Sequence, residues 1–203
     1  MSLSLANNKF YLAVCDCTGH GVPGAFMSLL NIGFLSEAIK EKNIEHPNEI
    51  LDYVRSRLEN TVSSDGQQDG MDGVLLRVEL INNQLCIEYS AANSEPVLIT
   101  DGKIIELSKD KMPIGIGEKT MPFTLQKIEL KAGDTLYLYT DGYADQFGGP
   151  KGKKFKYKQL NELLLSIQKE SSSQQRAILY KQFEDWKNNL EQVDDVLIFG
   201  IKI

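Results

Sequence analysis

The chain has 203 residues, of which 42% are hydrophobic and 25% are charged, and its formal net charge at pH 7 is −6. This composition is ordinary for a globular protein and excludes a disordered chain, a collagen-like repeat and a coiled coil. The acidic balance argues against nucleic acid and against an anionic membrane surface as the main partner.

The cysteines and the N-terminus indicate the compartment. Cys15 and Cys17 are too close in sequence for a usual disulfide, and the count of three is odd, so we expect reduced thiols and a cytoplasmic protein. The sequence contains no run of 18 apolar residues, so we expect no direct insertion into a membrane. Met1, Ser2 and Leu3 resemble a remnant of an expression vector, and we expect residues 1–203 to form one domain.

The first part of the chain predicts one strand and two helices. Residues 10–16 carry apolar side chains on both faces, which is typical of a strand covered on both sides. A helix is expected over residues 23–41, with so few polar residues that it should be mostly buried. A second helix should begin at Pro47, and the polar residues 63–70 should form a loop.

Strands dominate the middle of the chain, and turn residues connect them. Asp101-Gly102-Lys103 is the strongest hairpin signal. Residues 131–134 are expected to form another turn. The expected strands cover residues 73–80, 84–91, 97–100, 104–107, 123–130 and 135–140.

The chain should end with two helices and a strand. The helices are expected over residues 157–169 and 174–190, with Ser171 to Ser173 capping the second, and the last strand over residues 193–203. Hairpin connections favour antiparallel sheets with helices outside, which is the α+β class.

Three aspartates stand at the ends of expected strands. Asp16 ends the first strand, Asp141 ends the strand over residues 135–140, and Asp194 begins the last. If these strands lie side by side, the three carboxylates reach one rim, where their mutual repulsion requires a cation. Carboxylates suit Mg²⁺ or Mn²⁺, and two such ions would activate water. The alternative is that aspartate after a strand is a common turn residue.

The segments around these aspartates resemble one family. Residues 15–25 read Cys-Asp-Cys-Thr-Gly-His-Gly-Val-Pro-Gly-Ala, which is similar to the D-x-x-G-H-G-x-P signature of SpoIIE-like phosphatases. This group belongs to the metal-dependent 2C-type (PPM) serine/threonine phosphatases. The similarity continues through residues 111–116, 133–142 and 193–196. It implies a four-layer αββα sandwich, in which two packed antiparallel sheets carry helix pairs outside.

The resemblance also implies a set of site residues. Asp16 would bridge two ions, the backbone carbonyl of Cys17 would bind one of them, and Asp141 and Asp194 would complete the cage. The flanking residues that would support ligands or substrate are Gly19, Gly142, Asp145 and Asp195. In this set Asp145 would hold a metal-bound water. Asp195, which alternates to the face opposite Asp194, is expected to make a structural hydrogen bond.

Other chemically active residues have two interpretations each. His20 could donate a proton to the leaving oxygen or only stabilise the turn after Asp16. Cys15 and Cys17 could bind a soft metal, although small core residues are the commoner case. The lysines at 151, 153, 154, 156 and 158 could dock an acidic or phosphorylated partner or form a solvated loop. We assign no role to Asp69, Asp72 or Asn93.

The expected function is hydrolysis of phosphoserine or phosphothreonine by a metal-activated water. The family resemblance implies a bacterial regulatory protein as substrate, such as an anti-sigma-factor antagonist, and upstream sensor domains. The domain would then be the cytosolic part of a sensor, including a membrane-bound one. The alternatives are a catalytically weak partner-binding module and a phosphoesterase for small molecules. Retention of all three aspartates favours the enzyme.

One family feature is missing from this sequence. SpoIIE-like domains usually carry a strand with a G-D-F-Y-like motif upstream of the first signature, whereas the nine residues that precede the first expected strand contain no acidic side chain. We therefore expect an N-terminally truncated domain with incomplete metal occupancy and low activity. Its open sheet edge should pair with a second copy, giving a homodimer, or fray.

Overall fold

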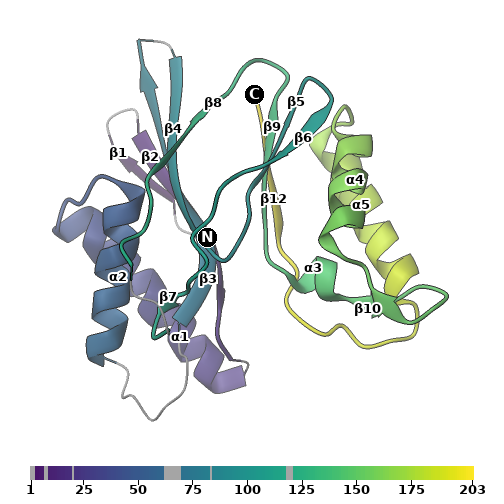
Figure 1. Cartoon of the computed structure of the whole chain (residues 1–203), viewed down its shortest axis with the longest axis horizontal. Helices are drawn as coiled ribbons and strands as arrows, with labels where there is room; N and C mark the ends of the chain where they lie inside the picture. The colour runs from purple at the N-terminus through teal and green to yellow at the C-terminus, as the bar shows by residue number, and fades with distance from the viewer. Residues whose placement is uncertain (1–2, 7–8, 20, 62–69, 83, 118–120) are drawn as a thin grey trace. The chain divides into compact units, whose positions relative to one another are not determined.

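The computed structural model describes residues 3–6, 9–19, 21–61, 70–82, 84–117 and 121–203. The chain forms two compact units, shown in Figure 1. The first unit comprises Met1–Glu95 and Ser108–Leu130, and the second comprises Pro96–Leu107 and Lys131–Ile203.

The first unit is built on an antiparallel sheet of order β1-β2-β3-β4-β8, with β7 beside β3. As predicted, the first long strand is buried on both faces, with Tyr11, Leu12, Ala13 and Val14 all at most 9% exposed. A short strand that the sequence did not predict, β1, precedes it. The strands are β1 (Leu3–Ala6), β2 (Lys9–Cys17), β3 (Gly70–Ile81), β4 (Gln84–Ala92), β7 (Ile114–Gly115) and β8 (Gln126–Glu129).

Two helices pack their apolar side chains into the core of this unit. They are α1 (Gly21–Ser36), which a π-helical turn over Glu37–Glu41 extends, and α2 (Pro47–Thr61). The predicted stripe of α2 is confirmed, because Ile50, Leu51, Val54 and Leu58 are fully buried. These residues join side chains of β2 and β3 in one hydrophobic core.

The predicted burial of α1 is wrong. Val22, Phe26 and Leu29 are 69%, 63% and 66% exposed. The reason is geometric: one stripe of α1, which includes Met27 and Phe34, reaches the core, and the apolar side chains on its other side have no element to pack against within the described residues. By length and hydropathy alone the stretch Gly21–Glu41 could also cross a membrane, a weak signal that core helices of soluble proteins share.

The second unit contains an antiparallel sheet of order β12-β9-β5-β6, so β12 and β6 are its edges. The predicted hairpin at Asp101-Gly102 is confirmed, and both residues have the positive φ values, 50° and 69°, that a tight turn of this kind requires. The strands are β5 (Val97–Thr100), β6 (Lys103–Glu106), β9 (Thr135–Tyr139) and β12 (Ile198–Lys202), with a separate hairpin of β10 (Phe147–Gly148) and β11 (Lys153–Lys154).

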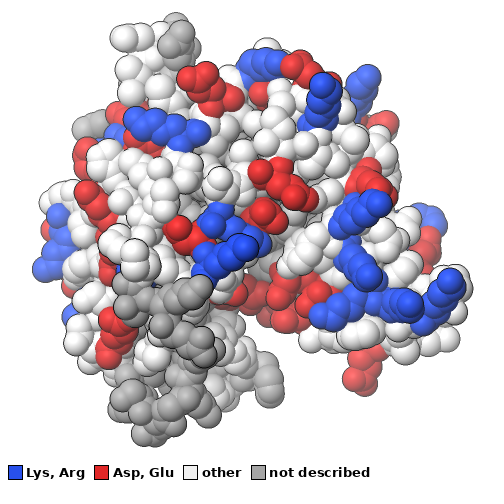
Figure 2. Space-filling model, viewed as in Figure 1, with Lys and Arg blue, Asp and Glu red and all other residues white. Residues whose placement is uncertain are grey.

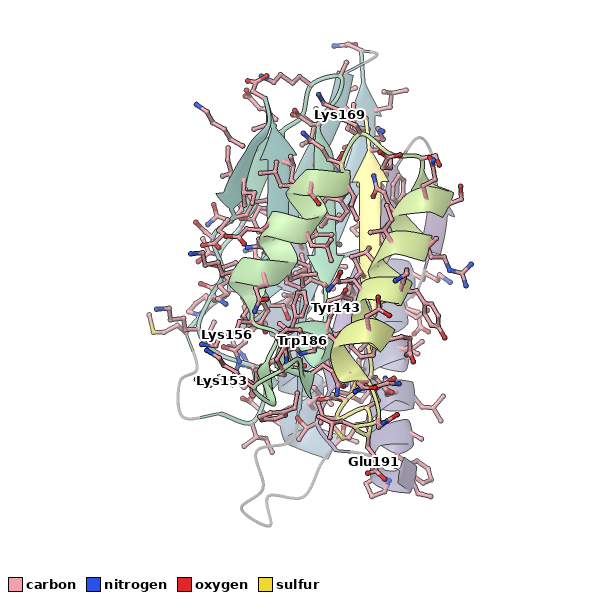
Figure 3. The ribbon with its side chains drawn as sticks, turned by 90° about the vertical axis from the view of Figure 1, so that its right-hand side faces the viewer. Tyr143, Lys153, Lys156, Lys169, Trp186 and Glu191 are labelled. Atoms are coloured by element: carbon pink, nitrogen blue, oxygen red, sulfur yellow. The ribbon has the colours of Figure 1, made fainter. Side chains whose placement is uncertain are left out.

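Helices α4 (Tyr157–Ile167) and α5 (Ser172–Lys187) lie side by side over one face of this sheet, as Figure 3 shows. The predicted serine cap is confirmed, because Ser171 and Gln174 form a capping box at the start of α5. Tyr143, on the short helix α3 (Gly142–Asp145), lies in the core beneath them and donates a hydrogen bond to the carbonyl of Leu179 (3.0 Å).

The predicted turn at residues 131–134 is confirmed, because the N–H of Asp134 donates to the carbonyl of Lys131 (3.0 Å). This turn joins two sheets, since β8 pairs with β4 in the first unit whereas β9 pairs with β5 and β12 in the second. The predicted start of the last strand is wrong. The last strand begins at Ile198 and not at residue 193, because the backbone N–H of Leu197 donates to the Thr140 hydroxyl before regular pairing starts. Two antiparallel sheets with a helix pair each nevertheless confirm the α+β class.

A buried carboxylate joins three elements of the first unit. Glu88, on β4, receives a hydrogen bond from Arg77 (3.0 Å), lies 3.0 Å from the Nδ1 atom of His46 and 3.4 Å from Lys127. Burial opposes its ionisation, but the contacts with His46, Arg77 and Lys127 outweigh burial and hold the pKa of Glu88 below its ordinary value.

We predict that Glu88→Gln lowers the free energy of unfolding in a pH-dependent way. Because the folded-state pKa is depressed, the stabilisation by Glu88 is present above the ordinary glutamate pKa of about 4.3 and is lost as the pH falls through the folded-state pKa. Urea unfolding at several pH values should show the difference between wild type and variant shrinking in acid. The exposed Glu129→Gln variant is the control, and an equal pH trend in both variants would contradict the prediction.

Candidate metal centre

The second unit brings two of the predicted ligands together. Asp141 follows the end of β9 after one intervening residue, Thr140, and directly precedes α3, and Asp194 lies in the loop before β12. Each offers a carboxylate oxygen within 4.8 Å of the other. Two like charges at this distance repel each other, so the surrounding backbone must hold both segments in place.

Thr140 fixes the distance between these two segments. Its hydroxyl donates to the carbonyl of Asp195 (3.0 Å) and accepts from the N–H of Leu197 (3.1 Å). Its own N–H donates to the carbonyl of Leu197 (3.1 Å). The threonine of the Thr140-Asp141-Gly142 (T-D-G) motif therefore binds the loop that carries Asp194.

Gly142 allows the close approach that this arrangement needs. A Cβ atom at this position would lie 2.4 Å from the carbonyl oxygen of Asp195, which is closer than real side chains come to backbone. The glycine of the T-D-G motif is thus required by the packing of α3 against residues 194–195.

Gln146 is a positioning residue that the sequence did not reveal. Its fully buried amide donates to the carbonyl of Glu191 (2.9 Å) and accepts from the N–H of Val193 (3.2 Å). It therefore ties the end of α3 to the segment just before Asp194. A single glutamine after a short helix carries no signal in the sequence, because its partners lie 45 and 47 residues away.

Asp16 lies at the end of β2 in the first unit, opposite Asp72 in the register of β2 and β3. Burial raises the pKa of Asp72, and the side chain of Asn93 donates to its Oδ1 (2.9 Å). Asp72 and Asn93, which had no assigned role, therefore form a half-buried polar pair next to Asp16.

The turn after Asp16 depends on glycines. Gly19 and Gly21 have φ values of 94° and 63°, and a Cβ at Gly24 would lie 2.6 Å from the carbonyl oxygen of Gly19. These contacts explain why the G-H-G-x-P-G segment needs three glycines to lead from β2 into α1. His20 lies outside the described residues, so its predicted role stays a prediction.

The two cysteines have different surroundings. Burial raises the pKa of Cys15 to about 12, which keeps this thiol protonated and favours the core interpretation over a soft-metal ligand. The side chain of Asn31, buried on α1, donates to Sγ of Cys17 (3.3 Å). The backbone of the next residue, Thr18, donates to the carbonyl of Gly70 (3.0 Å), which holds the end of β2.

The flanking acidic residues make local contacts. The N–H of Asp145 donates to the carbonyl of Asp141 (2.9 Å), and its carboxylate pairs with Lys154 (2.8 Å). The N–H of Asp195 donates to Oδ1 of Asp194 (2.7 Å). Asp195 is not in a strand, so the alternation that was used to place it does not apply.

The premise that the strands of all three aspartates lie side by side in one sheet is wrong. Strand β2 belongs to the sheet of the first unit, whereas β9 and β12 belong to the sheet of the second. A pocket of about 390 Å³ in the second unit, between α5 and β12, is lined by none of the predicted site residues.

The fold and the aspartate-bearing motifs define the class of protein: a PP2C-type, metal-dependent serine/threonine phosphatase domain. The SiaA-PP2C domain of Pseudomonas aeruginosa is similar over 100% of this chain and 79% of its own, with a TM-score of 0.87 and 25% identity. The family described as Stage II sporulation protein E (SpoIIE) matches residues 6–203, so the chain belongs to this family.

Two further structures share the fold. The PP2C phosphatase domain of SpoIIE from Bacillus subtilis, solved with a fragment of its regulatory domain, has a TM-score of 0.75 at 19% identity over 98% of this chain and 56% of its own. The catalytic domain of the phosphatase PstP, described in complex with two manganese ions, has a TM-score of 0.57 at 19% identity over 97% of this chain and 88% of its own. A search of curated protein sequences found no match.

We predict that Gly142→Ala destabilises the chain by about 1–3 kcal/mol, since the added methyl group forces the backbone at Asp195 to move. Urea unfolding measures the change. Gly33→Ala is the control, because no atom lies within 4 Å of a Cβ there and alanine favours a helix by about 1 kcal/mol. If the two variants were equally stable, the close approach at Gly142 would be energetically unimportant.

Proposed function

We propose that this domain hydrolyses phosphoserine or phosphothreonine on a bacterial regulatory protein, using Mn²⁺ or Mg²⁺ held by Asp16, Asp141 and Asp194. The observation that carries the proposal is the pair of Asp141 and Asp194, whose carboxylate oxygens lie within 4.8 Å of each other. Membership of the SpoIIE family supports it. The phosphoprotein partner, upstream sensor domains and a cytoplasmic location belong to the same proposal.

The donor chemistry fits hard divalent cations. Carboxylate oxygens and a backbone carbonyl are ligands that Mg²⁺ and Mn²⁺ prefer. A cation would also reduce the repulsion between the carboxylates of Asp141 and Asp194. The proposed metal-binding roles of Asp16 and of the Cys17 carbonyl, both in the first unit, are based on the family signature.

In the second unit, the residues around Asp141 and Asp194 would contribute by keeping these two metal ligands in fixed positions. When bound, the ions supply a water nucleophile at neutral pH and neutralise charge on the phosphoryl oxygens. Thr140, Gly142 and Gln146 fix the segments that carry the two aspartates, and the N–H of Asp195 orients one oxygen of Asp194. Such fixed geometry limits the reorganisation that the reaction needs.

The test is hydrolysis of p-nitrophenyl phosphate and of phosphopeptides across a Mn²⁺ titration. Asp141→Asn and Asp194→Asn should each lower kcat/KM by at least about 100-fold, because outer-shell changes alone cost 10–100-fold. Asp185→Asn, at an exposed position on α5, is the matched control. Release of phosphate from nucleotides or sugar phosphates in preference to phosphopeptides would favour a small-molecule phosphoesterase.

Metal binding should also appear as stability. We predict that Mn²⁺ at a hundredfold excess over its dissociation constant raises the free energy of unfolding by about 2.7 kcal/mol, and that EDTA reverses the gain. Thermal unfolding of wild type and of Asp194→Asn measures it, and the variant should gain much less. Absence of Mn²⁺-dependent stabilisation and of hydrolysis together would indicate the partner-binding module instead.

A further inference from the structure

The second unit carries a concentrated positive charge that the proposed chemistry does not use. Residues 151–158 contain five lysines and no acidic residue, in a chain whose net charge is −6. All five lysines are exposed. Figure 2 shows the basic side chains grouped over the part of this unit that holds the β10–β11 hairpin. We call residues 147–158 the basic hairpin.

Most of this charge has no counter-charge among the described residues. Lys154 pairs with Asp145 (2.8 Å) and lies 5.9 Å from the centre of the Phe147 ring. For Lys151, Lys153, Lys156 and Lys158 the described part of the chain offers no ion-pair partner. Four ammonium groups on long side chains are therefore available to a partner.

The basic hairpin is held rigidly at its base. The N–H of Gly149 donates to the carbonyl of Trp186 (2.8 Å), and the indole N–H of Trp186 donates to the carbonyl of Gln146 (3.0 Å). Phe155 is buried, with its ring 5.1 Å from the rings of both Tyr143 and Trp186. Because the backbone of the hairpin is held before a partner binds, less conformational entropy is lost on binding.

One lysine has a backbone conformation that a solvated loop would not need. Lys156 has φ 76° and ψ 147°, close to a region that is nearly restricted to glycine. Its N–H donates to the carbonyl of Ala144 (2.6 Å), and its carbonyl accepts from Leu160 at the start of α4. Strain of this kind persists where the surrounding structure holds it, and it is concentrated at functional positions.

The basic hairpin is also connected to a proposed metal ligand. Asp145 contacts Asp141 through its N–H and Lys154 through its carboxylate. Asp145 thus links the backbone of Asp141 to Lys154, so Asp141 and the basic hairpin lie at the same end of this unit. A phosphoprotein that presents its phosphate at Asp141 would bring the neighbouring residues of its own chain to the lysines.

We propose that the basic hairpin is a docking surface for an acidic segment that flanks the phosphorylated residue of the substrate. The proposal rests on the proposed function and names its substrate class: phosphoproteins with several aspartates or glutamates beside the phosphorylated serine or threonine. Lysine ammonium groups act as point charges without strict geometry, so they select charge and not one sequence. Their attraction acts over about 10 Å at 0.1 M salt, which makes the docking sensitive to salt.

The experiment compares two phosphopeptides that share one phosphoserine. One has acidic flanks, and in the other each flanking acid is replaced by its amide. We expect wild type to show a kcat/KM about tenfold higher for the acidic peptide at about 0.05 M salt, mainly through KM, and a smaller preference at about 0.5 M. Fluorescence anisotropy of the labelled acidic peptide measures binding without catalysis.

The decisive variant is K151Q/K153Q/K156Q/K158Q, which should lower the preference to about one and abolish the anisotropy change. The control K103Q/K131Q/K169Q/K181Q removes the same charge from exposed positions of the same unit and should keep the preference. Figure 3 shows Lys169 at the opposite end of the helices from Lys153 and Lys156.

The outcomes separate the two proposals. Salt-sensitive binding that the hairpin variant loses, without any Mn²⁺-dependent hydrolysis of p-nitrophenyl phosphate, would overturn the proposed function but leave the docking surface standing. Hydrolysis with equal rates for both peptides, or an equal loss of preference in both quadruple variants, would overturn the docking surface.

Discussion

The close approach of Asp141 and Asp194 is the constraint that the surrounding contacts of the second unit meet. Their carboxylate oxygens lie within 4.8 Å of each other, and like charges at this distance repel, so a backbone that is held on both sides favours the arrangement. Thr140, Gly142 and Gln146 supply that fixation through a hydroxyl, a missing side chain and a buried amide. Each contact joins the end of β9 or α3 to the loop before β12.

The same contacts set where regular structure stops. Strand β12 begins only at Ile198, because the backbone just before it bonds to Thr140 and Gln146 instead of pairing as a strand. Gln146 also accepts, through its own carbonyl, the bond from Trp186 on which the basic hairpin depends. One short segment therefore positions both the aspartate pair and the lysines, which links the proposed chemistry to the proposed recognition of substrate.

In the first unit, glycines and one polar contact fix the turn that follows Asp16. Glycines at 19, 21 and 24 let the chain turn sharply from the end of β2 into α1 directly beyond Asp16. Helix α1 then packs with one stripe only and leaves Phe26 and Leu29 exposed. Its buried Asn31 reaches Cys17, so a polar contact, and not apolar packing alone, joins the helix to the end of the strand.

The sequence by itself determined the features that depend on neighbours along the chain. The apolar spacing of α2, the turn at Asp101-Gly102, the cap at Ser171 and the motifs around the aspartates are local signals, and the structure contains each of these elements. Their physics acts over a few residues: helical periodicity, positive φ and a side-chain oxygen within reach of free N–H groups.

Only the tertiary structure decided which strands pair, which side of an apolar helix is covered and which polar residues hold the site. Residues 131–134 form the turn that the sequence predicts, but only the structure shows that this turn joins strands of different sheets, because strand pairing depends on partners far away in sequence. Asp72 and Gln146 matter through contacts with residues 21 and 45 positions away. Such hydrogen bonds leave no periodic pattern in the sequence, because their contribution to stability depends on the burial that the tertiary fold creates.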